Sequence, residues 1–133
     1  MQCPACEKAM LILEYKGIGL DHCPACGGVW LDAGELGLLL HGTPEPPAGL
    51  ALANARPGTR RCPRCPRKMN TGHFPNSTIE VETCPTLHGL WLDRGKLVAL
   101  AREQVDKAGD DAVAQHLLEL FGEQHNLTKE KTS

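Results

Sequence analysis

The chain contains the same arrangement of cysteines twice, and this arrangement limits the fold more than any other feature. Six of the seven cysteines fall in C-x-x-C pairs, and the seventh opens a fourth cluster that ends at a histidine. Each half of the pattern leads into a Gly-x-Trp-Leu-Asp segment, at residues 28–32 and 89–93. Cysteines grouped and repeated in this way are typical of metal sites. The four clusters are Cys3/Cys6, Cys23/Cys26, Cys62/Cys65 and Cys84/His88.

A metal is also what repeats of this size need. Each copy of the pattern spans about 40 residues, near the length below which apolar burial alone rarely holds a fold. Aromatic residues make up only 4% of the sequence, so little bulky apolar mass is available for a core. A structural zinc ion contributes about 10–16 kcal/mol of apparent binding free energy to folding. The sequence therefore predicts small units that fold around metal.

The cysteine count and the lack of long apolar runs indicate the cellular setting. An odd number of cysteines suits a disulfide framework poorly, and metal-bound thiolates belong in a reducing compartment. No positively charged start precedes an apolar run, and no stretch approaches the roughly 20 apolar residues that span a bilayer. We expect a cytoplasmic protein without a membrane partner.

The first repeat predicts a four-cysteine zinc site formed by Cys3, Cys6, Cys23 and Cys26. Sixteen residues separate its two pairs, which is enough for a hairpin that brings four thiolates to one tetrahedral ion. A rubredoxin-like iron site uses similar ligands and is not distinguished by spacing, although zinc suits a soluble ribbon better. Redox use of the C-x-x-C pairs is a weaker alternative, because the pairs are doubled and lack a surrounding βαβ pattern.

The second repeat predicts a zinc site with one changed ligand. Leu87 stands where the first repeat has a cysteine, and His88 follows one position later. Cys62, Cys65, Cys84 and His88 would form a Cys₃His site, because an imidazole reaches farther than a thiolate. The alternatives are that this site has decayed, or that His73 in the neighbouring hairpin is the fourth ligand. The favoured interpretation gives two zinc ions per chain.

The pattern predicts a small α+β fold of two tandem zinc ribbons, each a β-hairpin plus a third short strand followed by a helix, with an added C-terminal helix. In the first repeat, alternating and β-branched residues indicate a hairpin over residues 10–22, and Asp32 is the expected helix N-cap with Glu35 as its capping-box partner. Asp93 is the expected cap in the second repeat. The predicted units are a ribbon at 1–42, a Pro/Ala/Gly linker at 43–59, a ribbon with a longer helix at 60–109, an amphipathic helix at 110–122 and a polar tail at 123–133.

The first repeat resembles a known family at residues 3–36. Its Cys-Pro-x-Cys pairs and the run Gly-Gly-Val-Trp-Leu-Asp-x-Gly-Glu-Leu are similar to the bacterial zinc-finger family named after the zinc ribbon of transcription factor IIB. Residues 62–97 resemble the same family but depart from it at Leu87/His88 and at Lys96, where the pattern has Glu. The resemblance implies structural zinc ribbons and a role linked to transcription or nucleic acid.

Two surfaces are candidates for partner contact. Net charge is −2, but residues 43–76 carry about +5, which suits contact with nucleic acid. The leucine-rich helices suggest the alternative of a protein–protein adaptor or a homodimeric scaffold. A metal-handling or thiol redox protein is a third and weaker alternative. The candidate basic contacts are Arg56, Arg60, Arg61, Arg64, Arg67 and Lys68.

Catalysis has little support in the sequence. Both expected metal sites are filled by protein ligands, which leaves no open position for water or substrate. No catalytic residue is assigned, because the sequence has no nucleophile–base pair and no phosphate-binding glycine loop. We expect a non-catalytic, zinc-binding module without a small-molecule substrate that contacts nucleic acid or the transcription machinery.

Overall fold

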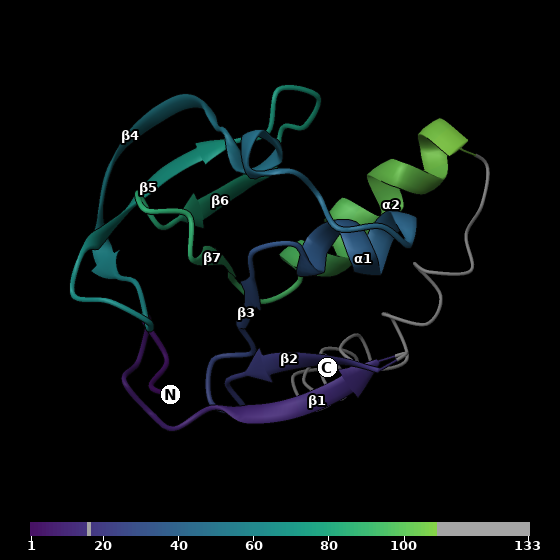
Figure 1. Ribbon diagram of the computed structural model, residues 1–133. Helices are drawn as coiled ribbons and strands as arrows, with labels where there is room; N and C mark the ends of the chain where they lie inside the picture. Colours follow the sequence, from purple (N-terminus) through teal and green to yellow (C-terminus); the bar gives the residue numbers. More distant parts are fainter. Residues whose placement is uncertain (16, 109–133) are drawn as a thin grey trace, which may run out of the picture.

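A computed structural model describes residues 1–15 and 17–108. Its two helices lie beside a sheet to which both repeats contribute (Figure 1). The predicted helix at 110–122 and the polar tail at 123–133 lie outside the described residues. The elements are β1 Leu11–Tyr15, β2 Ile18–His22, β3 Val29–Asp32, α1 Glu35–His41, the 3₁₀ helix η1 Pro47–Leu50, β4 Ala53–Arg61, β5 Lys68–His73, β6 Glu80–Thr83, β7 Gly89–Leu92 and α2 Lys96–Ala108.

The two repeats share one antiparallel sheet of seven strands, in the order β1-β2-β3-β7-β6-β5-β4. The repeats meet where β3 pairs with β7, and Trp30 lies opposite Trp91 in that pairing. The predicted first hairpin and third strand are confirmed by β1, β2 and β3. Each repeat supplies one strand of the central β3–β7 pair. The division into two separate ribbon units therefore stays a prediction.

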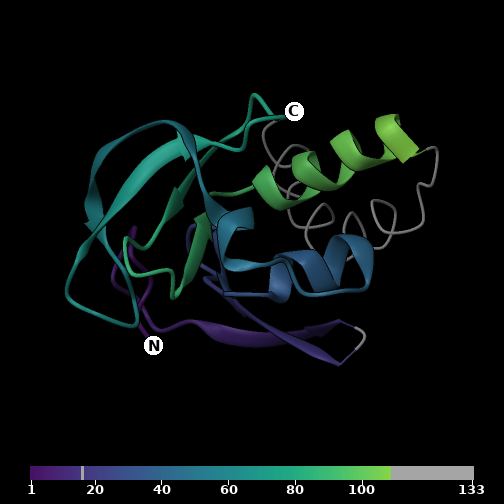
Figure 2. The same cartoon turned by 45° about the horizontal axis from the view of Figure 1, so that its top comes forward.

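The strands at the centre of the sheet bury side chains on both faces. Leu31 and Leu90 point to one face, where they pack with apolar residues of both helices. Trp30 and Trp91 point to the other face, where they pack against the cysteines. This alternation follows from the two-residue period of a β-strand. The helices and the cysteine clusters therefore lie on opposite faces, and Figure 2 shows α1 and α2 together on the helical face.

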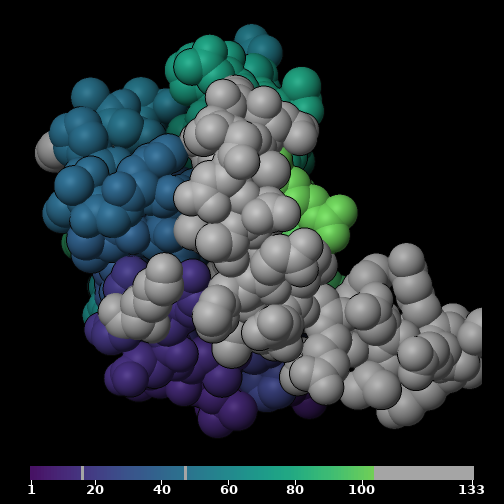
Figure 3. Space-filling view, turned by 90° about the vertical axis from the view of Figure 1, so that its right-hand side faces the viewer, coloured from purple at the N-terminus to yellow at the C-terminus, as the bar shows by residue number. Residues whose placement is uncertain are grey.

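The segment predicted to be a linker, residues 43–59, contributes to the fold. It contains η1 and the first part of β4, which pairs with β5 and forms an edge of the sheet. Leu50 is only 1% exposed and belongs to the core on the helical face. β4 tolerates Pro57 because an edge strand has one side without ladder hydrogen bonds, and its register shifts near this residue. Figure 3 shows this part of the chain, in blue, lying directly against the first repeat.

The predicted helix N-cap at Asp32 is wrong, although the expected hydrogen bond between Asp32 and Glu35 is present. α1 begins after Gly34, so Asp32 is not its N-cap residue, and the N–H of Gly37 in its first turn donates to the Glu45 carboxylate instead. The Asp32 carboxylate is instead used in contacts described below. Glu35 does accept a hydrogen bond from the Asp32 backbone N–H at 2.7 Å, as a capping box requires. The helix ends at its C-cap residue Gly42, which has a φ of 78° and whose N–H donates to the Leu38 carbonyl.

Candidate metal centres

The first cluster gathers all four predicted cysteines of the first repeat. Their Sγ atoms lie within 4.8 Å of one another. Two of the sulfur pairs are the Cys3 and Cys26 Sγ atoms, 3.5 Å apart, and the Cys6 and Cys23 Sγ atoms, 3.3 Å apart. Two of the four cysteines are buried and two are half-buried, so the centre is closed from most sides.

The second cluster gathers Cys62, Cys65, Cys84 and His88, whose ligand atoms also lie within 4.8 Å of one another. The Nδ1 atom of His88 is 3.3 Å from the Cys84 Sγ atom and 3.9 Å from the Cys62 Sγ atom. The cluster contains His88 rather than His73, whose ring lies beside Asn54 and the Phe74 carbonyl. Unlike the cysteines, His88 is exposed.

These distances fit tetrahedral zinc. With Zn–S bonds of about 2.3 Å, the sulfurs of a regular tetrahedron are about 3.8 Å apart, and a sulfur and an imidazole nitrogen are about 3.6 Å apart. The Sγ–Sγ distance of 3.6 Å between Cys65 and Cys84 is close to the first value. The two Sγ–Nδ1 distances at His88 lie on either side of the second. The second donor set therefore matches the size of a zinc ion, and the two sulfur pairs of the first, at 3.5 and 3.3 Å, are slightly closer together.

Backbone N–H groups are aimed at the sulfurs in both clusters. The Ala5 and Cys6 N–H groups lie 3.3 and 3.4 Å from the Cys3 Sγ atom, and the Arg64 N–H group lies 3.3 Å from the Cys62 Sγ atom. Such hydrogen bonds stabilise thiolates, which are the form of cysteine that binds metal. The C-x-x-C turns thus prepare each cluster for a cation.

The second knuckle of the second repeat has a different turn. In the first repeat, Gly27 has a φ of 80° and its N–H donates to the Cys23 carbonyl at 2.8 Å. In the second repeat, the left-handed residue is Leu87, with a φ of 62°, and its N–H donates to the Cys84 carbonyl at 2.9 Å. The turn is one residue shorter, and this change brings His88 to the cluster in place of the missing cysteine.

The two tryptophans connect the clusters. Trp30 and Trp91 are 0% and 1% exposed and pack in one buried group with cysteines of both repeats. Each indole also lies against a glycine of the other repeat: a Cβ atom at Gly28 would overlap the Trp91 ring, and one at Gly89 would lie 2.8 Å from the Trp30 ring. Both tryptophans are therefore core residues, and each packs against both repeats.

Each tryptophan also donates a hydrogen bond to an aspartate. The Nε1–H groups of Trp30 and Trp91 donate to Asp32 and Asp93 at 2.9 and 3.1 Å. Asp32 also accepts two hydrogen bonds from Arg64 of the other repeat, one of them at 2.7 Å from Nη2. Burial acts to raise the pKa of Asp32, but the hydrogen bonds from Arg64 and Trp30 outweigh it and lower the pKa. Asp32 therefore remains a carboxylate that joins the repeats.

Half of the candidate contact residues in the basic segment are paired with carboxylates. Arg56 pairs with Glu80, and Arg60 bonds to both Glu82 and Asp93, at 2.9 and 2.6 Å. With Arg64 bound to Asp32, three of the six candidate contact residues have acidic partners. No carboxylate of the described residues pairs with the other three, Arg61, Arg67 and Lys68.

Sequence reasoning missed Thr86 and the partners of the two aspartates. The Oγ1 atom of Thr86 lies 3.1 Å from the Cys84 Sγ atom and 3.2 Å from the His88 Nδ1 atom. A comparison of the two repeats could have indicated Thr86, because the first repeat has Ala25 at the equivalent position. The pairing of Asp32 with Arg64 joins residues 32 positions apart and left no local pattern.

The thiols of each cluster differ strongly in acidity. Burial raises the pKa of Cys3 and of Cys62 to about 12. Burial acts in the same direction at Cys84, but hydrogen bonds from the Thr86 hydroxyl and from backbone N–H groups lower its pKa to about 6. The pKa of Cys23 is lowered to about 7, because hydrogen bonds from backbone N–H groups and from Cys6 outweigh its burial. Without metal, each cluster holds at least one proton at neutral pH.

Zinc binding is therefore expected to strengthen as the pH rises. The Cys3 and Cys62 thiols carry protons between pH 6 and 8, and zinc must displace them because only thiolates bind it. Each displaced proton changes the apparent affinity by about tenfold per pH unit. Competition with a chelator of known pH dependence measures the affinity. An affinity that does not change between pH 6 and 8 would contradict the assignment of these thiols as ligands.

Two metal clusters on β-hairpin knuckles, with Cys₄ and Cys₃His donor sets, define a zinc-ribbon protein. The family model described as "Transcription factor zinc-finger" matches residues 2–41 and 61–103, and the chain belongs to this family. The match confirms the resemblance in both repeats. Together with the two clusters it supports two Zn²⁺ ions per chain. No curated protein and no solved structure matches the chain.

Within residues 1–15 and 17–108, neither helix is long and apolar enough to cross a bilayer.

Proposed function

We propose that the protein is a non-catalytic zinc module that docks a protein of the transcription machinery, with the two zinc ions holding its docking surface in shape. The family supports the link to transcription, and the donor sets support a structural role for the metal. The proposed ligands are Cys3, Cys6, Cys23, Cys26, Cys62, Cys65, Cys84 and His88. A groove between the two helices is the observation that carries the proposal.

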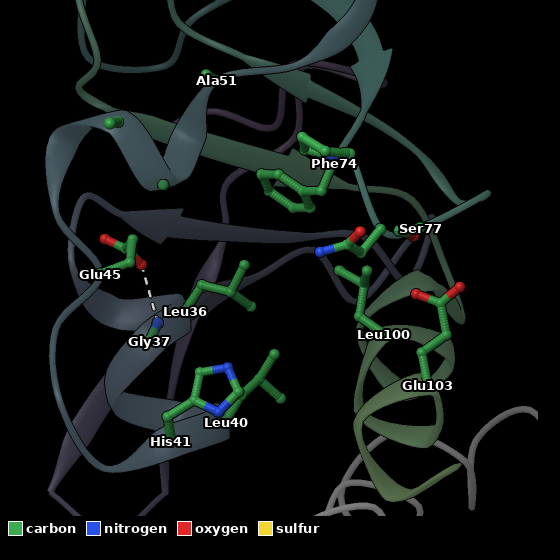
Figure 4. Close-up of a pocket in the computed structure, with 14 residues that line it drawn as sticks. Leu36, Gly37, Leu40, His41, Glu45, Ala51, Phe74, Ser77, Leu100 and Glu103 are labelled. Atoms are coloured by element: carbon green, nitrogen blue, oxygen red, sulfur yellow. Dashed lines mark hydrogen bonds between the residues drawn. The ribbon is translucent and has the colours of Figure 1, made fainter. Parts of the chain in front are cut away.

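The groove has a volume of about 520 Å³ and opens between α1 and α2 (Figure 4). Leu36 and Leu40 of α1 line one side, Leu100 of α2 lines the other, and Phe74 closes one end. Its lining thus comes from both repeats, and pockets of this size commonly bind ligands where structural units meet. The leucine-rich helices, which suggested a protein adaptor from the sequence, supply the three leucines of its apolar walls.

The rim of the groove is acidic. Glu45 and Glu103 lie on opposite sides of it, and no Lys or Arg is among the described residues that line it. The Glu45 carboxylate also accepts a hydrogen bond from the Gly37 N–H at 2.8 Å, which fixes its position beside α1. Complementary charge favours a partner segment that inserts an apolar side chain flanked by Lys or Arg. We therefore infer a basic amphipathic helix as the occupant.

Direct contact with nucleic acid is the second candidate, and the basic segment is the observation that favours it. Three of its cations, however, already pair with carboxylates of this chain. A phosphate would have to compete with those carboxylates. The remaining cations, Arg61, Arg67 and Lys68, would provide few of the phosphate contacts that give DNA-binding proteins their affinity. Protein docking is the better supported proposal.

The test uses the zinc-loaded full chain and two probes. The first is a fluorescent peptide of about 16 residues that forms a Leu/Lys amphipathic helix, compared with the same peptide carrying Glu in place of Lys. The second is a DNA duplex of about 20 base pairs, titrated from about 50 to 200 mM salt. The variant Ala51→Arg places a bulky cation in the groove, and Ala55→Arg places the same charge on exposed β4 outside it.

The proposal expects the Leu/Lys peptide to bind, the Glu peptide to bind much more weakly, and Ala51→Arg to weaken binding by at least about tenfold while Ala55→Arg does not. Binding of neither peptide would overturn it. Salt-dependent DNA binding that disappears when Arg61, Arg67 and Lys68 are changed to Gln, without peptide binding, would replace it with the nucleic-acid function.

A further inference from the structure

The two metal centres differ in how firmly they can hold zinc. The first offers four thiolates, all buried or half-buried, whereas the fourth ligand of the second is the exposed imidazole of His88. With one thiolate fewer, the second centre attracts the cation less strongly. An exposed ligand is also open to water and to competing chelators. Both differences make the second zinc the easier one to remove.

Thr86 lowers the cost of emptying the second centre. Its hydroxyl is within hydrogen-bond distance of both the Cys84 Sγ atom and the His88 Nδ1 atom, at 3.1 and 3.2 Å. When zinc leaves, this hydroxyl can donate to the Cys84 sulfur and accept from the His88 Nδ1–H, which gives both released ligands a hydrogen bond. The first centre has Ala25 at the equivalent position, and a methyl group gives no such replacement.

The segments that carry the second centre also hold the start of α1 in the first repeat. The His88 carbonyl accepts a hydrogen bond from the Ala33 N–H at 2.9 Å. Arg64, which lies between Cys62 and Cys65, pairs with Asp32. Asp32 ends β3 and Ala33 begins the turn that leads into Glu35 and α1, and α1 forms one wall of the groove. Loss of zinc from the second centre can therefore change the position of α1 and, with it, the proposed docking surface.

We propose that the protein responds to zinc: the second centre releases its zinc before the first, and this loss loosens the turn at residues 32–35 and α1. The inference rests on the proposed function, because it adds regulation by zinc to the groove. Its own test needs no docking partner. A protein that binds the Leu/Lys peptide but loses both zinc ions together would overturn only this inference.

The first experiment measures zinc release from the two-zinc protein into an excess of a chromogenic chelator. We expect two phases of one zinc each, differing by at least about tenfold in rate. The double variant Leu87→Cys/His88→Gly gives the second centre the Cys-x-x-Cys-Gly pattern of the first, and we expect it to lose the fast phase. Native mass spectrometry must first show two zinc ions bound to this variant, as it should show one tightly bound zinc in His88→Ala.

A matched pair of single variants tests the role of Thr86. Thr86→Ala is expected to slow the fast phase, and Ala25→Thr to speed the slow one. Release of both zinc ions in one phase from the unmodified protein would overturn the order of release. So would a fast phase that remains in a two-zinc Leu87→Cys/His88→Gly protein.

The second experiment follows backbone hydrogen exchange in the one-zinc protein. Faster exchange is expected at residues 33–40, whereas the β1–β2 hairpin keeps its protection because its own zinc remains. Exchange at 33–40 that equals that of the two-zinc protein would show that the second centre does not control α1, and would overturn the inference.

Discussion

Removal of both zinc ions is expected to unfold the whole described sheet. One of the two cores consists of the cysteines, Met69 and the two tryptophans, so its packing depends on the metal clusters. A structural zinc contributes about 10–16 kcal/mol, which is as large as the entire stability of an ordinary domain. The near-ultraviolet circular dichroism of Trp30 and Trp91 reports on this core. We expect it to vanish with a strong chelator and to return with Zn²⁺ but not with Mg²⁺.

A double variant gives the same test without a chelator. Cys23→Ser/Cys84→Ser removes a fully buried ligand from each cluster. Ala25→Ser/Thr86→Ser changes the corresponding knuckles and leaves every ligand in place. The first variant should bind no zinc and lack the tryptophan signal, whereas the second should resemble the unmodified protein. Native-like circular dichroism in the zinc-free chain would contradict a structural role for the metal.

Replacing Gly89 with alanine is expected to destabilise the protein by about 3 kcal/mol, at the upper end of the range for overpacked cores. The added Cβ would lie 2.8 Å from the Trp30 ring and 3.0 Å from the Asp32 Cα atom, and it would overlap the Leu31 carbonyl oxygen. Two of these atoms belong to the backbone of β3 and cannot move without breaking the pairing of β3 with β7. Denaturation by guanidinium, followed by tryptophan fluorescence, measures the loss.

Gly19→Ala is the matched control for this prediction. Gly19 also lies in a strand, but its added Cβ would meet only the Ile12 Cγ2 atom, at 3.3 Å. Ile12 is 74% exposed and can turn away. We expect a change within about 0.5 kcal/mol, as for most surface substitutions. Equal midpoints for Gly89→Ala and the unmodified protein would show that the two repeats do not meet as described.

The sequence predicted the features that local spacing controls. The C-x-x-C pairs and the hairpin of residues 10–22 depend on residues close to one another in the chain. The residues of both metal clusters could also be predicted, because the spacing of each knuckle and the reach of an imidazole are local properties. The change from cysteine to Leu87/His88 was visible in the sequence for the same reason.

The sequence did not predict how the repeats combine. The pairing of β3 with β7 depends on tertiary contacts between segments about 60 residues apart. The sequence of Val29–Asp32 alone does not indicate which strand pairs with it. β4 was missed because proline and glycine in its sequence suggest a linker, whereas its place at an edge of the sheet tolerates both. The aspartates were assigned to helix caps because a local role was the only one that sequence could supply.

The pairing of Trp30 with Trp91 brings equivalent residues of the two repeats face to face across antiparallel strands. This is the geometry of an isologous contact between two identical subunits, in which each surface is its own complement. The chain is therefore built like a homodimer whose subunits have been fused into one polypeptide. Fusion frees such a dimer from the requirement that both halves be identical. One half can keep four thiolates while the other acquires His88 and Thr86.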